Sequence, residues 1–254
     1  MQLKGKTALI SGAGRNNGKA IALTFAREGA DLILVARTLG DELNQVAKQC
    51  ESYGVKALPL LADVTKPEEA NRVVQLGLER FGKVDVLVNV VGMRLHKSLL
   101  ELSYDEWQLV FATNCHSLFH LSKAVIPGMI QRKSGNIIAL GGMACMRPQL
   151  NGALVVSSKH ALYGLIKSIA LEFGPHGIRA NLLNPGNVEN VRLHPEWYAH
   201  LGGEPNSAAE IELTPLRRIA TNQEIANVAV FLASDQSSFI TGDRILTTGG
   251  RYIS

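Results

Sequence analysis

A glycine-rich segment near the start of the chain carries residue types that bind phosphate groups. It reads Ser11-Gly12-Ala13-Gly14-Arg15-Asn16-Asn17-Gly18 and lies between an apolar run and an amphipathic segment. Glycines let the backbone approach a pyrophosphate closely, and the free amides at a helix N-terminus favour an anion. We therefore expect a nucleotide here, contacted by Ser11, Gly12, Gly14, Arg15, Asn16, Asn17 and Gly18. A tight turn that binds no ligand is the alternative.

Side chains at the ends of two further apolar runs indicate which nucleotide is bound. Arg37 closes the second run, where an NAD-specific site usually has an acidic residue for the ribose 2′-hydroxyl. Together with Arg15 it suits a 2′-phosphate, so we expect NADP(H), with NAD(H) as an alternative. A solvated surface position is the alternative for either arginine alone. Asp63, followed by Val64, ends the third run and is expected to contact adenine, or else to cap a helix together with Thr65.

Apolar, β-branched runs alternate with longer amphipathic segments along most of the chain. Strands are expected at Thr7–Ile10, Asp31–Val35, Ala57–Leu61, Val84–Val88, Gly135–Leu140 and Arg179–Leu183. Helices are expected at Lys19–Glu28, Leu43–Tyr53, Pro67–Phe81, Tyr104–Met129 and Leu154–Phe173. Strands joined by helical crossovers pair in parallel, and runs that are apolar throughout are buried on both faces. The expected fold is α/β, a single-domain doubly wound parallel sheet over residues 1–254, whose ligands bind at the carboxyl ends of the strands.

Composition and charge narrow the function classes. The 254 residues are 46% hydrophobic, which is enough for one sizeable core. The net charge of +4 comes from scattered lysines and arginines, so nucleic acid is not an expected partner. Cys50, Cys115 and Cys145 form no CxxC pair, so neither a disulfide framework nor a thiolate metal site is expected. No apolar stretch approaches the roughly 20 residues of a membrane span, and no secretory leader is recognisable. We therefore expect a cytoplasmic protein with no membrane partner.

An ordered set of motifs resembles the short-chain dehydrogenase/reductase family from Lys6 to the C-terminus. In chain order the motifs are Ser11 through Gly18, Asp63-Val64, Asn89-Val90-Val91-Gly92, Asn114, Ser158-Lys159, Pro185-Gly186, Thr241-Gly242 and Gly249-Gly250. The resemblance implies a Rossmann-like single domain, a nicotinamide cofactor, and a homotetramer or homodimer built through Tyr104–Met129, Leu154–Phe173 and the C-terminal strand. It adds further expected cofactor contacts at Asn89, Gly92, Lys159, Pro185, Gly186 and Val188.

Two positions depart from the Ser-Tyr-Lys arrangement that the resemblance implies. Lys159 is kept, but Val155 stands four residues before it, where the family has its proton-donating tyrosine. Gly142 stands where the family has its serine. A positioned acid contributes roughly 10²–10⁴-fold in rate, so ordinary carbonyl reduction is expected to be impaired. Lys159 and Asn114 are the family's remaining catalytic residues, with Asn114 expected to stabilise a helix kink and position a water.

A replacement donor is expected from loops at the same edge of the sheet. The candidates are Arg94, His96, Cys145, Arg147, His194, Tyr198 and His200. His96 is the first choice because imidazole titrates near neutral pH, although an exposed loop histidine is the ordinary alternative. His116 and His120 are four residues apart on one predicted helix, but no third ligand follows at useful spacing, so no metal is expected.

The favoured function is an atypical NADP(H)-dependent oxidoreductase with a displaced or substrate-assisted proton donor, acting on a carbonyl or a conjugated carbon–carbon double bond. A catalytically inactive nucleotide-binding or regulatory protein is the first alternative, and a non-redox, lyase-like enzyme is the second. Residues 187–215 mix aromatic, histidine and glycine residues without a clear period, which favours a substrate lid. The expected substrate is a small apolar or amphipathic molecule.

Overall fold

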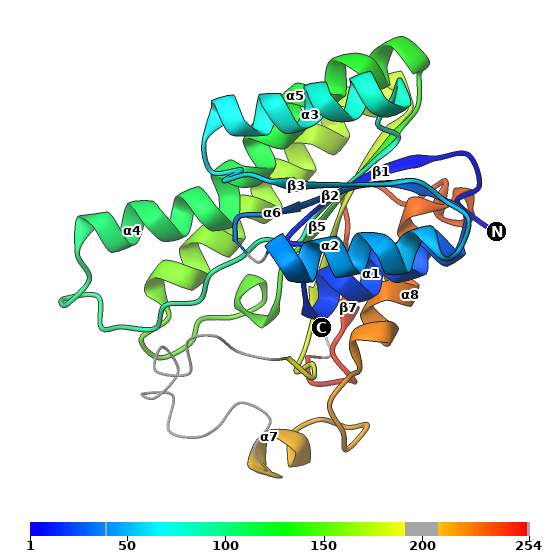
Figure 1. Ribbon diagram of the computed structural model, residues 1–254. Helices are drawn as coiled ribbons and strands as arrows, with labels where there is room; N and C mark the ends of the chain where they lie inside the picture. Colours follow the sequence, from blue (N-terminus) through cyan, green and yellow to red (C-terminus); the bar gives the residue numbers. More distant parts are fainter. Residues whose placement is uncertain (39, 191–207, 253–254) are drawn as a thin grey trace.

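Seven parallel strands form one sheet at the centre of the molecule (Figure 1). The computed structural model describes residues 1–38, 40–190 and 208–252. The strands are β1 (Thr7–Ser11), β2 (Asp31–Ala36), β3 (Ala57–Leu61), β4 (Val86–Asn89), β5 (Gly135–Leu140), β6 (Ile178–Pro185) and β7 (Arg244–Thr247). Their order across the sheet is β3-β2-β1-β4-β5-β6-β7. The predicted doubly wound parallel sheet is thereby confirmed.

Helices cover both faces of the sheet (Figure 1). On one face lie α1 (Asn16–Arg27), α2 (Gly40–Glu51) and α8 (Asn222–Ala233), and on the other lie α3 (Pro67–Phe81), α5 (Ser117–Arg132) and α6 (Ala153–Phe173). Two shorter helices, α4 (Tyr104–Phe111) and α7 (Ala208–Glu212), lie beyond the carboxyl edge of the sheet. None of the described helices combines the length and the apolar character needed to cross a membrane.

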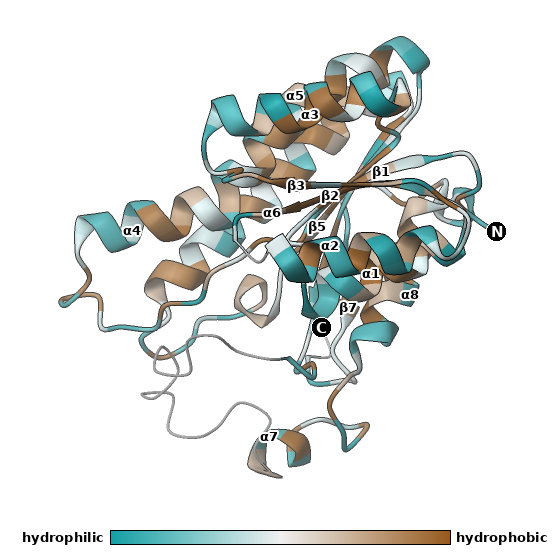
Figure 2. Cartoon of the chain, in the orientation of Figure 1, coloured by the Kyte–Doolittle hydropathy of each residue, from teal (hydrophilic) through white to brown (hydrophobic). Residues whose placement is uncertain are grey.

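Alternate residues of each central strand enter two different cores. On β2, Leu32 and Leu34 pack with α1, α2 and α8, whereas Ile33 and Val35 pack with α3 and α5. Figure 2 accordingly shows brown strands between helices whose outer faces are largely teal. Because both faces of the sheet are covered, the central strands are predominantly apolar, which is the pattern that predicted a parallel sheet.

The predicted helix Tyr104–Met129 is wrong as a single element. It is interrupted by a π-helical turn, Ala112–His116, which separates α4 from α5. A π-turn carries an extra residue without ending the helical path, so hydrophobic periodicity barely registers it. Asn114, where a kink was predicted, lies within this turn.

Elements near the C-terminus were absent from the predicted set. Helix α8 begins with a capping box in which the Thr221 and Glu224 side chains each accept a hydrogen bond from the other's backbone amide. The edge strand β7 has only four residues, all partly exposed. Short edge strands carry a weak apolar signal, which explains why the pattern did not reveal this one.

The strand order reverses direction at the β1–β4 pair. Strand β1 lies between β2 and β4, so the chain leaves β1 toward one side of the sheet and returns on the other. The last residues of this pair are Ser11 and Asn89, and the Ser11 hydroxyl donates to Asn89 Oδ1 at 2.7 Å. The loops that follow diverge, and such a switch point is where doubly wound sheets bind ligands.

Candidate functional site

A cleft of about 620 Å³ opens at the carboxyl ends of the central strands. This volume lies within the range of small-molecule and cofactor sites. Of the residues expected to contact a nucleotide, those that line the cleft are Gly12, Gly14, Arg15, Asn16, Asn17, Gly18, Arg37, Asp63, Val64, Gly92, Lys159, Pro185, Gly186 and Val188. The sequence motifs, which are spread over most of the chain, therefore converge on one surface.

The glycine-rich turn fits the backbone of this end of the cleft. Gly12 has φ +73°, and a Cβ on Gly18 would lie 2.0 Å from the Gly12 carbonyl oxygen. Asn16 has φ +48°, a left-handed conformation that asparagine tolerates better than most residues. The turn brings the N-terminus of α1 to the cleft, and the first turn of α1 contains no acidic residue. Free amides at a helix N-terminus favour an anion, so this turn is the candidate anion site.

Charged side chains flank this anion site. Arg15 is partly buried and Arg37 is exposed, and both line the cleft. Asp63 is held in place because its Oδ1 accepts hydrogen bonds from the Thr65 amide at 3.1 Å and the Thr65 hydroxyl at 2.6 Å. The residue that caps α3 is Lys66, so Asp63 closes a turn instead of capping that helix. Asp63 lines the cleft, and its contact with adenine stays a prediction.

Ser11 and Asn89 do not line the cleft, although both were predicted to contact the cofactor. Their relative exposures are 0% and 1%. Besides accepting from Ser11, Asn89 donates from Nδ2 to the Ser117 hydroxyl at 3.2 Å, and that hydroxyl donates to the Thr113 carbonyl at 2.7 Å. The pair therefore joins β1 and β4 to the π-helical turn behind the cleft wall.

Lys159 lines the cleft where Gly92 and Leu140 approach it. It lies on α6 with 6% exposure, and its Nζ donates to the Leu140 carbonyl at the end of β5 at 2.8 Å. Burial lowers the pKa of Lys159 to about 8, and the nearby Arg94 guanidinium acts in the same direction. An ammonium with this pKa exchanges its proton close to neutral pH.

Asn114 fixes the surroundings of Lys159 from behind the cleft. The side chain is fully buried, its Oδ1 accepts from the Met93 amide at 2.7 Å, and its Nδ2 donates to the Met93 carbonyl at 3.0 Å. The same Nδ2 donates to the Ser158 hydroxyl at 2.9 Å. The amide of Asn114 thus ties the loop after β4 to the residue that precedes Lys159.

Neither Val155 nor Gly142 brings a hydroxyl to this end of the cleft. Val155 is 2% exposed. Gly142 has φ +134°, and its amide donates to Asn184 Oδ1 at 3.2 Å. A Cβ on Gly142 would lie 3.4 Å from Arg94 Nη2, so the guanidinium occupies the space beside the glycine.

Arg94 is the one candidate donor that lines the cleft in the described part of the chain. His96, two residues later, is 2% exposed and is not among the lining residues. Cys145 is fully buried, and burial raises the pKa of its thiol. Arg147 is exposed, with its guanidinium over the Tyr252 ring at 4.5 Å.

The remaining donor candidates, His194, Tyr198 and His200, lie outside the described residues, as does most of the predicted lid 187–215. Of the two helix histidines, His116 and His120 have ring centroids 6.4 Å apart. No group of three or more histidine, cysteine or acidic side chains that could hold a metal ion occurs among the described residues.

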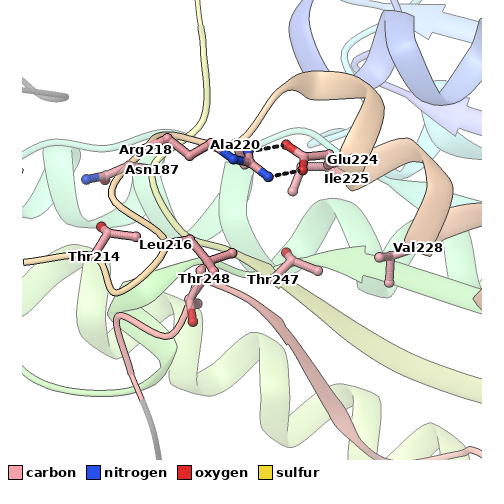
Figure 3. A pocket seen from close by; sticks show the side chains of 11 residues that line it. Asn187, Thr214, Leu216, Arg218, Ala220, Glu224, Ile225, Val228, Thr247 and Thr248 are labelled. Atoms are coloured by element: carbon pink, nitrogen blue, oxygen red, sulfur yellow. Dashed lines mark hydrogen bonds and ion pairs between the residues drawn. The ribbon is translucent and has the colours of Figure 1, made fainter. Parts of the chain in front are cut away.

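A second pocket of about 200 Å³ lies between β7 and α8 (Figure 3). Its charged residues are Arg218 and Glu224, which form hydrogen-bonded ion contacts of 2.6 and 2.8 Å. The contact with Arg218 lowers the pKa of Glu224 to about 2. Because these charges satisfy each other, the larger cleft is the better candidate site.

Comparison with known proteins gives matches over nearly the whole chain. A family profile described as Enoyl-(Acyl carrier protein) reductase matches residues 12–251. The chain is 35% identical to oxidoreductase UcpA of Escherichia coli O157:H7, covering 98% of this chain and 95% of that protein. It is 34% identical to the 3-oxoacyl-(acyl-carrier-protein) reductase FabG of Salmonella typhimurium, covering 100% of both.

Two solved structures are similar in fold. A short-chain type dehydrogenase/reductase from Mycobacterium marinum has 31% identity and a TM-score of 0.89, over 100% of this chain and 98% of that one. An NAD⁺-bound xylitol dehydrogenase has 31% identity and a TM-score of 0.91, over 98% of this chain and 100% of that one.

The burial of Lys159 predicts a pH-dependent stability difference. With a folded-state pKa of about 8 and an ordinary value of 10.5, the folded state carries a buried charge below pH 8 and releases that proton before the unfolded chain does. The free energy of unfolding of the protein, minus that of Lys159→Met, should therefore rise by about 2–3 kcal/mol between pH 7 and 10.5. Urea unfolding of both proteins measures this difference, and parallel pH profiles would contradict it.

Proposed function

The chain belongs to the short-chain dehydrogenase/reductase family, and we propose that it is an oxidoreductase that binds a nicotinamide dinucleotide in the 620 Å³ cleft. One observation carries the proposal: the glycine-rich turn at the start of α1 and the buried ammonium of Lys159 line the same cleft. The bound nicotinamide would supply or accept the hydride. The residues of the chain bind and orient it and exchange the proton.

The dinucleotide we propose is NADP(H). Strand β2 ends in Val35-Ala36 and is followed by Arg37, so no carboxylate follows it to bind a ribose 2′-hydroxyl. Arg37 and Arg15 both line the cleft, and two guanidinium groups favour the extra phosphate of NADP(H). The xylitol dehydrogenase relative is bound to NAD⁺, so family membership alone does not decide between the two cofactors.

We further propose that the active site is atypical and that Lys159 is the group that exchanges the proton. Val155 and Gly142 carry no ionisable group, and the His96 donor predicted from the sequence is buried away from the cleft lining. Lys159 lines the cleft with a pKa of about 8, and losing its proton relieves the cost of a buried charge. For His96 to act as the donor, its side chain would have to leave its buried position.

Homo-oligomerisation through the helices is part of the proposal. On α6, Leu162 and Ile169 are 1% and 4% exposed and pack in the core of the single chain, so they are not available to an interface. On α4, α5 and α6 the large apolar or aromatic side chains left exposed among the described residues are Tyr104, Leu109, Phe119 and Leu171. These residues favour association of the chain through its helices.

A second candidate function is a nucleotide-binding protein without turnover. The same two positions, Val155 and Gly142, favour it, because the nicotinamide end lacks preorganised hydroxyl donors for a developing alkoxide. Under this alternative the dinucleotide binds and no substrate is reduced.

The cofactor preference has a direct test. Nicotinamide fluorescence titration should show that the protein binds NADPH more tightly than NADH. Arg37→Asp should lower the affinity for NADPH by about tenfold or more and leave the affinity for NADH unchanged. Arg80→Asp is the matched control, because it makes the same charge change at an exposed position of α3 outside the cleft. Tighter binding of NADH by the unaltered protein would contradict the proposal.

The missing hydroxyl at position 155 has a second test. Val155→Tyr should raise NADPH-dependent reduction of simple ketones by about tenfold or more, since a phenol beside Lys159 supplies the absent acid. Val155→Phe adds the same ring without the hydroxyl and should not raise the rate. Position 142 is left unchanged, because a serine there would have a strained φ of +134°. Equal rates for the Tyr and Phe variants, with NADPH binding intact, would favour the nucleotide-binding alternative.

A further inference from the structure

The guanidinium of Arg94 is an unpaired cation within the cleft. Arg94 follows β4, is partly buried and lines the cleft. In the described ranges 1–38, 40–190 and 208–252, no hydrogen bond or ion pair involves its side chain. Most of the protein's partly buried arginines are satisfied by protein atoms; Arg179, for example, donates to the carbonyls of Leu232, Ser234 and Ile240. The N–H groups of the Arg94 guanidinium are therefore available to hydrogen-bond a ligand.

The location of Arg94 places this cation at the reacting end of the cleft. Its Nη2 lies beside Gly142, and it is close enough to Lys159 to contribute to the lowering of that lysine's pKa. The anion site that would take a pyrophosphate is elsewhere, at the turn between β1 and α1. Arg94 is thus available to a group other than the dinucleotide phosphates.

The cations at this end lack a compensating acid. Among the described residues that line the cleft, Asp63 is the only one with a carboxylate, and it follows β3 at the opposite side of the switch point. Arg94 and Lys159 repel each other across a partly desolvated space, and an anion placed between them removes that cost. A guanidinium presents a planar fork of donors that binds a carboxylate or a phosphate group in two parallel hydrogen bonds. Because the dinucleotide phosphates have their own place at the turn between β1 and α1, a carboxylate is the anion that we assign to Arg94.

We propose that Arg94 binds a carboxylate of the substrate, so that the substrates are small organic acids whose reacting carbonyl or conjugated double bond is adjacent to that carboxylate. This inference rests on the proposed oxidoreductase function and replaces the apolar or amphipathic substrate predicted from the sequence. In reduction, the hydride of NADPH goes to carbon and a proton from Lys159 completes the product, while the carboxylate stays bound to Arg94. The glycine at position 142 leaves the space that the guanidinium needs.

The test compares an acid with its neutral isostere. Isothermal titration of the protein saturated with NADP⁺ should show that crotonate binds about tenfold or more tightly than crotonamide. Arg94→Gln should remove this preference by weakening crotonate alone, and Arg94→Lys should restore part of it. NADP⁺ affinity should stay unchanged in both variants. Arg147→Gln, which removes a charge outside the cleft, is the matched control.

Turnover supplies a second readout. With 2-oxobutanoate or crotonate as the reduced substrate, Arg94→Gln should raise KM more than it lowers kcat. The inference is overturned if the unaltered protein binds crotonate no more tightly than crotonamide. It is also overturned if Arg94→Gln lowers the affinity for NADP⁺ as much as it lowers the affinity for crotonate. Failure of the oxidoreductase proposal is seen separately, as absence of NADPH binding, and the same two titrations without dinucleotide then still decide whether Arg94 selects a carboxylate.

Discussion

The hydrogen bonds of the Asn114 amide hold the reacting end of the cleft together. This buried side chain donates twice and accepts once, and its partners belong to the loop after β4 and to α6. An amide buried without these partners would cost about 1–3 kcal/mol for each unmade bond. The π-helical turn Ala112–His116 is the backbone arrangement that places Asn114 between the two segments. Met93, Arg94 and Lys159 therefore keep their relative positions without any bond between Arg94 and Lys159.

Most of the fold was predictable because burial on both faces leaves a strong signal in the sequence. The runs that form β1, β2, β3 and β5 are predominantly apolar and differ by at most one residue from their predicted bounds. The π-turn was not predictable from periodicity, since one extra residue shifts the pattern without breaking it. Hydrophobic periodicity did not predict strand β7, because this edge strand has only four residues, all partly exposed, and so carries little apolar signal.

The two ends of the candidate site differ in how far the sequence reveals them. The anion site is made by one contiguous segment, so residue types and spacing alone predicted that Gly12, Arg15 and Gly18 act together. The reacting end is made by residues far apart in the chain. Which of Arg94 and His96 faces the cleft is set by the conformation of an irregular loop, and imidazole chemistry favoured the one that the fold buries. The proximity of the Arg94 guanidinium to Gly142 is a tertiary contact between residues far apart in the chain, and no local sequence pattern predicts it.

The account depends on a dinucleotide occupying the cleft at the β1–β4 switch point and not the smaller pocket beside α8. Hydrogen–deuterium exchange followed by mass spectrometry, with and without saturating NADPH, measures this most directly because it reports protection segment by segment. The account predicts slower exchange in peptides that cover residues 12–18 and 90–94, and unchanged exchange in peptides that cover residues 222–233. Protection confined to residues 214–228, or no protection anywhere at saturating NADPH, would contradict it.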